Sequence, residues 1–143
     1  AFNKVLAKTL KVPSIKWEDY YFASVEKINE MQDLLVWAGE YYRIGLMTNV
    51  MPGFLNRMIK ENDLPDVKYD QIIDSSVEKS VKPEAKIFKI AAEKAGVPPK
   101  EILLIDDARA NLMTAERDGW KVLWFDDYHP GEGAERIRQL LEF

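Results

Sequence analysis

After about residue 42, short apolar runs that end in polar residues alternate with segments of helical periodicity. The runs span 43–48, 69–73, 101–106 and 121–125, and continuous apolar runs of this length are typical of strands buried on both faces. Such alternation requires crossover connections between parallel strands. The sequence therefore predicts an α/β fold over residues 43–143, a three-layer domain with helices on both faces of a parallel sheet.

Residues 1–42 show helical periodicity and no strand pattern. Apolar side chains recur at helical spacing in three short segments, the first containing Leu6, the second Trp17 and the third Leu34, with a break at Pro13. We interpret residues 1–42 as a small helical cap, or the remnant of one, beside the α/β domain.

Composition excludes several classes of protein. The chain has 143 residues, a net charge of −4 and no cysteine, so disulfides and thiolate metal sites are excluded. Lysine and arginine are spread along the chain, which gives no basic surface for nucleic acid or an anionic membrane. Because no apolar run approaches the roughly 20 residues of a membrane span and no targeting segment is recognisable, we expect a cytoplasmic protein. Oligomeric state and substrate identity are not indicated.

Polar side chains follow the predicted strands at their carboxyl ends, where ligands bind in open parallel sheets. Thr48 and Asn49 follow the first strand, Lys82 precedes a proline-started helix, and Asp106 and Asp107 end the third strand. Hard oxygen ligands hold Mg²⁺, while hydroxyl and ammonium groups bind phosphoryl oxygens. Adjacent carboxylates repel one another unless a cation joins them. The pattern therefore predicts a phosphate site with Mg²⁺ at Asp106 and Asp107.

Simpler structural interpretations exist for the same residues. The acid pair could be a strand end and a helix N-cap, Thr48 could bond its own loop, and Lys82 could be solvated. We expect the remaining conspicuous side chains to be exposed loop residues or packing residues: Asp126, Asp127, His129, Trp17, Trp37, Trp120 and Trp124.

Three segments, GLMTN (45–49), KSVKPEAKIF (79–88) and ILLIDDARANLMTAERDG (102–119), resemble in order and separation three of the four signature motifs of the haloacid dehalogenase (HAD) superfamily. The resemblance covers roughly residues 15–125 and is strongest to the phosphatase-like branch with a small helical cap. It implies that Thr48 bonds the transferring phosphoryl group, Asn49 helps to hold the substrate and Lys82 neutralises charge. The implied metal ligands and the residue that braces their loop are Asp106, Asp107 and Asn111.

The first motif of that superfamily, an apolar strand ending in Asp-x-Asp, is absent, because no two aspartates in the chain are separated by a single residue. The first aspartate of the motif is the nucleophile, the second is the acid/base, and their strand is central in the family's sheet. The resemblance thus implies the strand order 4-3-gap-1-2, with the central nucleophile strand missing. We expect the chain to be part of a longer polypeptide whose N-terminal segment completes the site.

The leading hypothesis is a Mg²⁺-dependent phosphomonoester hydrolase that acts on a small phosphorylated metabolite through an aspartyl-phosphate. A 2-haloacid dehalogenase is the nearest alternative, although that branch needs no metal and typically has serine and asparagine in place of Asp106 and Asp107. A non-catalytic binding or regulatory module is a second alternative, and a receiver-like phospho-acceptor domain is a third.

Overall fold

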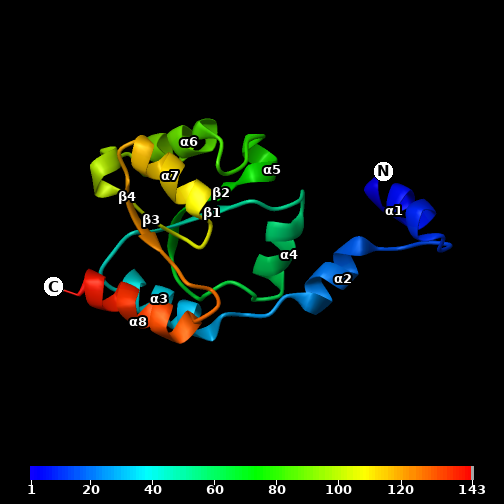
Figure 1. Ribbon diagram of the computed structural model, residues 1–143, viewed down its shortest axis with the longest axis horizontal. Helices are drawn as coiled ribbons and strands as arrows, with labels where there is room; N and C mark the ends of the chain where they lie inside the picture. The colour runs from blue at the N-terminus through cyan, green and yellow to red at the C-terminus, as the bar shows by residue number, and fades with distance from the viewer. Residues whose placement is uncertain (143) are drawn as a thin grey trace.

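The computed structural model describes residues 1–142, and strands and helices alternate in its second part as the sequence predicts (Figure 1). The longest described helix has 12 residues, and no described helix has the length and apolar character needed to cross a bilayer. The strands are β1 Ile44–Thr48, β2 Tyr69–Asp74, β3 Leu103–Asp106 and β4 Lys121–Trp124. The helices are α1 Phe2–Leu10, α2 Trp17–Ser24, α3 Asn29–Gly39, α4 Phe54–Lys60, α5 Ser75–Glu78, α6 Ala85–Ala95, η1 Pro99–Glu101, α7 Arg109–Arg117 and α8 Pro130–Leu141.

The four strands form two parallel pairs instead of one continuous sheet. β1 pairs with β2, ending with Thr48 opposite Asp74, and β3 pairs with β4, ending with Asp106 opposite Trp124. Within residues 1–142 no ladder joins the two pairs. The prediction of a parallel α/β fold with a break between the strand pairs is therefore confirmed.

Helices cover both faces of the strands and bury two apolar clusters. Figure 1 shows α6 and α7 on one side of the strands and α3 and α8 on the other. On the α6–α7 side, Ile73 of β2 and Leu104 of β3 belong to the same cluster, so this core crosses the break between the strand pairs. The first cluster comprises Ile73, Ile87, Phe88, Ala91, Leu104, Leu112, Ala115 and Trp120. The second comprises Leu34, Phe125, Ala134 and Ile137.

Helix α6 illustrates how the sequence specifies an element. Ile87, Phe88 and Ala91 lie at helical spacing and are all buried, because one face of an amphipathic helix packs on the strands. Gly96 ends the helix with φ 65°, a left-handed conformation that costs glycine least.

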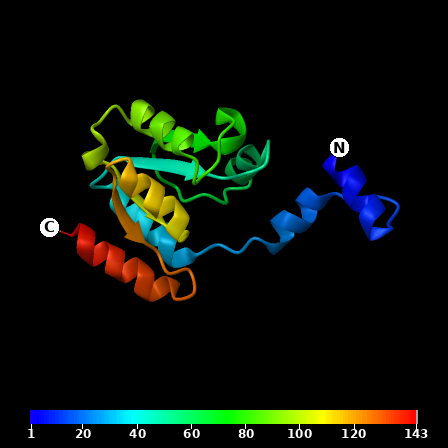
Figure 2. The ribbon, with the colours of Figure 1, turned by 45° about the horizontal axis from the view of Figure 1, so that its top comes forward.

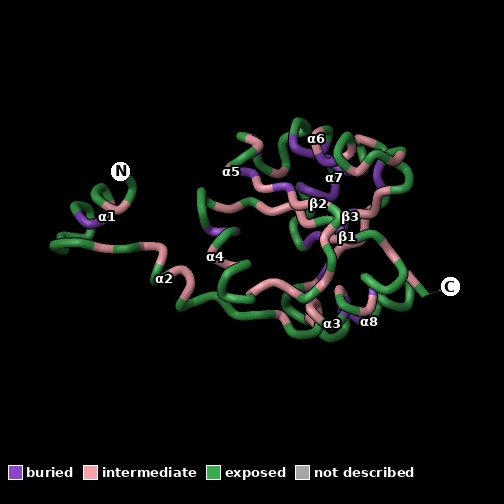
Figure 3. The backbone as a smooth tube through the Cα atoms, turned by 180° about the vertical axis from the view of Figure 1, so that it is seen from behind, coloured by how far each residue is buried: buried purple, intermediate pink, exposed green. Residues whose placement is uncertain are grey.

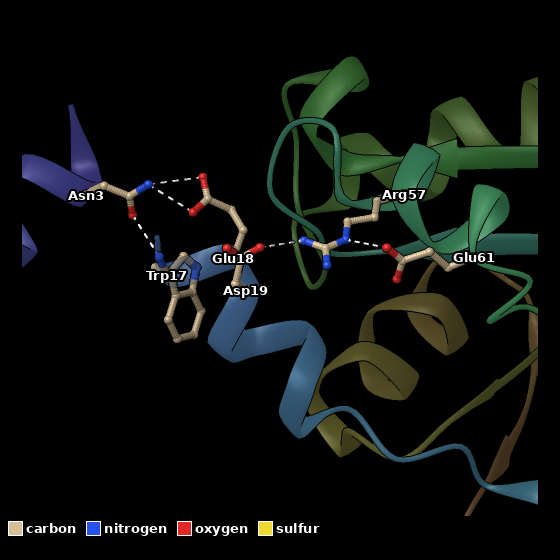
Figure 4. A network of polar contacts seen from close by, with 6 residues as sticks. All are labelled: Asn3, Trp17, Glu18, Asp19, Arg57 and Glu61. Carbon is tan, nitrogen blue, oxygen red and sulfur yellow. Dashed lines mark hydrogen bonds and ion pairs between the residues drawn. The ribbon is translucent and has the colours of Figure 1, made fainter. Parts of the chain in front are cut away.

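Helices α1 and α2 form an arm that projects from the α/β body (Figures 1 and 2) and is mostly exposed (Figure 3). Polar contacts connect the arm to α4 (Figure 4). Asn3 Nδ2 donates to Glu18 Oε2 at 2.9 Å within the arm, and Arg57 of α4 pairs with Asp19 at 3.2 Å and with Glu61 at 2.7 Å. Exposed pairs of this kind contribute little stability each.

Helix α3 packs differently from the arm. Leu34 is 5% exposed and lies in the second apolar cluster with Phe125 and Ile137, so α3 contributes to the α/β core. The sequence predicts a helical cap, or the remnant of one, over residues 1–42. From this packing we propose a boundary between Ser24 and Asn29, which leaves α1 and α2 as the helical arm.

The loop after β4 contains the single histidine, which is exposed as expected but has a hydrogen-bond partner. His129 Nδ1 lies 3.0 Å from Asp126 Oδ2. The hydrogen bond with Asp126, and then its charge, raise the pKa of His129, and the same hydrogen bond lowers the pKa of Asp126. The pair is therefore strongest between the two pKa values, when His129 is protonated and Asp126 is ionised.

We predict that Asp126→Asn lowers the pKa of His129 toward its ordinary value of about 6.5. Protonated His129 stabilises the fold through this pair. The contribution is complete at pH values below the unfolded-state pKa of the histidine, and it is lost as the pH rises through the folded-state pKa. Titration of the single histidine ring by NMR measures the shift directly, with Asp127→Asn as the matched control. An unchanged pKa in Asp126→Asn would contradict the pairing.

Candidate functional site

Asp106, the last residue of β3, lies at the centre of a polar cluster at the carboxyl ends of the strands. Its side chain is 5% exposed, and Lys82 Nζ contacts Oδ2 at 2.6 Å. Asn111 Nδ2, from the first turns of α7, donates to both carboxylate oxygens at 3.0 and 3.1 Å. The backbone N–H of Ala108 donates to Oδ1 at 2.8 Å. Both oxygens of the buried carboxylate are thus held by donors.

The charge of Asp106 follows from these contacts. Burial raises the pKa of a carboxyl group, but here the Lys82 ammonium and the hydrogen bonds from Ala108 and Asn111 outweigh it and hold the pKa of Asp106 below its usual range. Asp106 is therefore ionised at neutral pH. Lys82 is nearly buried, with its side chain 13% exposed. Its ammonium and the buried Asp106 carboxylate neutralise one another, and their pairing joins two separate segments of the chain.

Asn49 fixes the backbone of Lys82. Asn49 Nδ2 donates to the Lys82 carbonyl at 2.9 Å, and the Lys82 N–H donates to Asn49 Oδ1 at 2.8 Å. This reciprocal pair uses both ends of the asparagine amide. The loop after β1 and the segment before α6 are therefore joined directly, and the Lys82 ammonium starts from a fixed backbone.

Ser75 also bonds to the loop after β1. It is 4% exposed, and its Oγ accepts from the Val50 N–H at 3.0 Å and contacts the Val50 carbonyl at 3.3 Å. Thr48, which precedes this loop, lies opposite Asp74 at the end of β1. The Asp74 carboxylate caps α5 by accepting from the Ser76 N–H at 2.8 Å, which is the usual role of an N-cap aspartate.

Asp107 differs from its neighbour. The residue is exposed, and its carboxylate makes no hydrogen bond with any residue that the structure describes. Its backbone carbonyl accepts from the indole N–H of Trp124 at 2.9 Å. The adjacent acids thus divide into a buried carboxylate engaged by protein donors and an exposed carboxylate that is available to a ligand.

The carboxylates of this site can be compared with the ligands that Mg²⁺ requires. Among residues 1–142 there is no group of three or more His, Asp or Glu side chains placed to hold a metal. Mg²⁺, however, is commonly held by one or two carboxylates, with water and substrate phosphate completing an octahedron. The exposed carboxylate of Asp107, next to the fixed carboxylate of Asp106, fits this requirement for one or two carboxylates.

The sequence pattern indicates some of these residues but not others. The structure brings Asn49, Lys82, Asp106 and Asn111 into one connected cluster, whereas Thr48 and Asp107 lie at the same strand ends without a side-chain bond to it. No pattern in the sequence indicates a role for Ser75. The sequence predicts Trp124 to be a packing residue, although its position at the end of β4 matches that of Asp106 in β3.

Comparison with known proteins identifies the class. The sequence profile of the haloacid dehalogenase-like hydrolases matches residues 3–125. The chain therefore belongs to the haloacid dehalogenase-like hydrolase family. Within residues 1–142, the parallel strand pairs and the aspartate at the end of β3 are those that the sequence motifs predicted.

Particular relatives cover the chain to different extents. A HAD-like family hydrolase from Porphyromonas gingivalis superposes with a TM-score of 0.75 at 25% identity over 99% of this chain and 73% of its own. A HAD family enzyme from Bacteroides thetaiotaomicron, solved with magnesium and inorganic phosphate, gives a TM-score of 0.60 at 28% identity over 68% of this chain and 52% of its own. Mouse acyl-CoA dehydrogenase family member 10 is 29% identical over 101 residues, 69% of this chain and 9% of the mouse protein. The chain thus spans about half of the Bacteroides enzyme and a small part of the mouse protein.

We predict that Lys82→Met destabilises the full-length protein by about 3–5 kcal/mol, because it leaves the Asp106 carboxylate buried without its counter-ion. The double variant Lys82→Met/Asp106→Asn should cost less than the sum of the two single variants. Urea unfolding of the four proteins measures this coupling.

Lys94→Met is the matched control, since Lys94 pairs with Glu78 at the surface and its side chain is 47% exposed. Exposed pairs contribute less than about 1 kcal/mol. Equal destabilisation by Lys82→Met and Lys94→Met would mean that the buried pair has no special role.

Proposed function

We propose that the protein containing this chain is a Mg²⁺-dependent phosphomonoester hydrolase. The observation that carries the proposal is the difference between the two adjacent acids, Asp106 and Asp107, at the end of β3. Asp106 is buried, ionised and bound by Lys82 and Asn111, while Asp107 presents an unengaged carboxylate to solvent. The Bacteroides relative, which is 28% identical, was crystallised with magnesium and inorganic phosphate, and this supports the same ligands here.

Each residue of the cluster has a proposed task. Lys82 has further N–H donors beyond the one that faces Asp106, and these neutralise the phosphoryl group. The Thr48 hydroxyl donates to a phosphoryl oxygen from the end of β1. Bound Mg²⁺ would supply the remaining positive charge to the phosphoryl oxygens, held by Asp107 and, directly or through water, by Asp106.

Asn49 takes a positioning task in this proposal. Both ends of its amide bind the backbone of Lys82, so it orients the lysine and does not need to contact substrate. Asn111 has the corresponding task on the other side, because it holds the Asp106 carboxylate from α7.

The nucleophile comes from outside the residues of this chain. We propose that an apolar strand ending in Asp-x-Asp lies between the β1–β2 pair and the β3–β4 pair, where no ladder joins the described strands. Its first aspartate attacks phosphorus, the ester P–O bond breaks, and the leaving alkoxide takes a proton from the second aspartate. The second aspartate, now ionised, takes a proton from water as the water attacks the phosphorus of the aspartyl-phosphate. Inorganic phosphate is released, and the first aspartate is regenerated as a carboxylate and the second as the acid.

We predict that the full-length protein hydrolyses a generic aryl phosphate in Mg²⁺ and loses this activity in EDTA. Asp107→Asn should lower kcat by about 10²–10³-fold, because it removes a charged metal ligand that stabilises the transition state. Phosphate release at a series of Mg²⁺ concentrations measures both effects.

Asp127→Asn is the matched control, since Asp127 is an exposed acid that follows the end of β4. Phosphatase activity that survives EDTA, or that is equal in Asp107→Asn and the wild type, would contradict the metal assignment. Chloride release from a 2-chloro acid without added metal would instead favour the dehalogenase alternative.

A further inference from the structure

The indole of Trp124 is bonded to the backbone of the acidic loop. Trp124 ends β4 directly opposite Asp106 in the strand register. From there its Nε1–H donates to the carbonyl of Asp107, one residue beyond the end of β3, at 2.9 Å. This bond connects the outer strand of the pair to the residue that presents its carboxylate to solvent.

Two arginine guanidinium groups lie close to the Trp124 indole. The guanidinium of Arg109, the first residue of α7, lies 4.5 Å from the centre of the Trp124 ring, and that of Arg136 lies 5.8 Å from it. Arg136 Nη2 also donates to the Trp124 carbonyl at 2.5 Å. Neither arginine forms an ion pair with a carboxylate among residues 1–142. The two cation–π contacts and the Nε1–H bond to Asp107 together restrict the rotation of the indole.

Three successive residues of the β3–α7 turn are therefore each held by one interaction. The Asp107 carbonyl accepts from the indole, the Ala108 N–H donates to Asp106, and Arg109 stacks on the same indole. No described side chain bonds to the Asp107 carboxylate. The direction of that carboxylate consequently depends on the backbone of the turn.

We propose that Trp124 is a positioning residue that fixes the turn and thereby orients the Asp107 carboxylate toward Mg²⁺. The proposal rests on the proposed function, because it needs a metal at Asp107. Groups that orient a metal ligand without touching the metal commonly alter affinity by an order of magnitude or more. Trp124 acts on the backbone and not on the carboxylate, so its effect belongs at the lower end of that range.

The test is direct Mg²⁺ binding to the full-length protein by calorimetry, in Trp124→Phe, Asp107→Asn and the wild type. Trp124→Phe retains an aromatic ring for Arg109 and removes the N–H donor together with the rest of the five-membered ring. We expect about tenfold weaker Mg²⁺ binding, and in aryl phosphate turnover an equal rise in the Mg²⁺ requirement with kcat recovered at saturating Mg²⁺. A merely structural role would lower kcat or thermal stability without shifting the Mg²⁺ dependence.

Trp37→Phe makes the same chemical change beside Tyr41 and Arg138 and should bind Mg²⁺ like the wild type. If Asp107→Asn weakens binding but Trp124→Phe does not, the Trp124 proposal alone is wrong. If Asp107→Asn binds Mg²⁺ like the wild type, or the wild type binds none, the metal site and the Trp124 proposal both fail.

A second measurement on the unmodified protein covers the case in which Trp124→Phe does not fold. Hydrogen exchange of the indole N–H groups by NMR should show Trp124 exchanging more slowly than Trp37, because its N–H is bonded, and more slowly still with Mg²⁺ present. Exchange of Trp124 as fast as that of Trp37, or unaffected by Mg²⁺, would overturn the proposal.

Discussion

The buried pair between Lys82 and Asp106 is the interaction on which the rest of the site depends. A carboxylate removed from water needs a counter-ion and hydrogen-bond donors. Here Ala108 and Asn111, which follow Asp106 closely in the chain, supply the donors, and the counter-ion comes from a distant segment. Lys82 belongs to the segment between β2 and α6, and Asp106 belongs to β3. Because Asn49 in turn holds the Lys82 backbone, the carboxyl ends of the two strand pairs are joined by one polar chain.

This polar connection joins two strand pairs that are not joined by a backbone ladder among the described residues. They share instead an apolar cluster on the α6–α7 side, to which both Ile73 and Leu104 belong. Side chains thus join the two strand pairs, while the strand edges between them stay unpaired. Because unpaired strand edges are templates for pairing, this arrangement is suited to receive a further strand. In our account that strand supplies the nucleophile, while Lys82 and the proposed Mg²⁺ supply positive charge for the phosphoryl group.

The sequence predicted the fold well, because alternating apolar runs and helical periods leave few arrangements for four parallel strands. It also indicated Lys82, Asp106 and Asn111, which the structure brings together. It could not show that the Asn49 amide binds the Lys82 backbone, that Ser75 holds the loop after β1, or that α3 packs in the core. Nor could it show the bond from Trp124 to Asp107. Each of these contacts joins residues that are distant in the chain, and neither periodicity nor spacing records such a contact.

The central claim is that this chain carries the charged half of a phosphoryl-transfer site and receives its nucleophile on an inserted strand. A crystal structure of the full-length protein with Mn²⁺ in place of Mg²⁺, and with phosphate, tests it most directly. The account predicts a parallel strand paired with both β1 and β3, an aspartate at its end, and an anomalous Mn²⁺ peak at the Asp107 carboxylate with Lys82 still bound to Asp106. Direct pairing of β1 with β3, or Mn²⁺ bound away from Asp107, would contradict it.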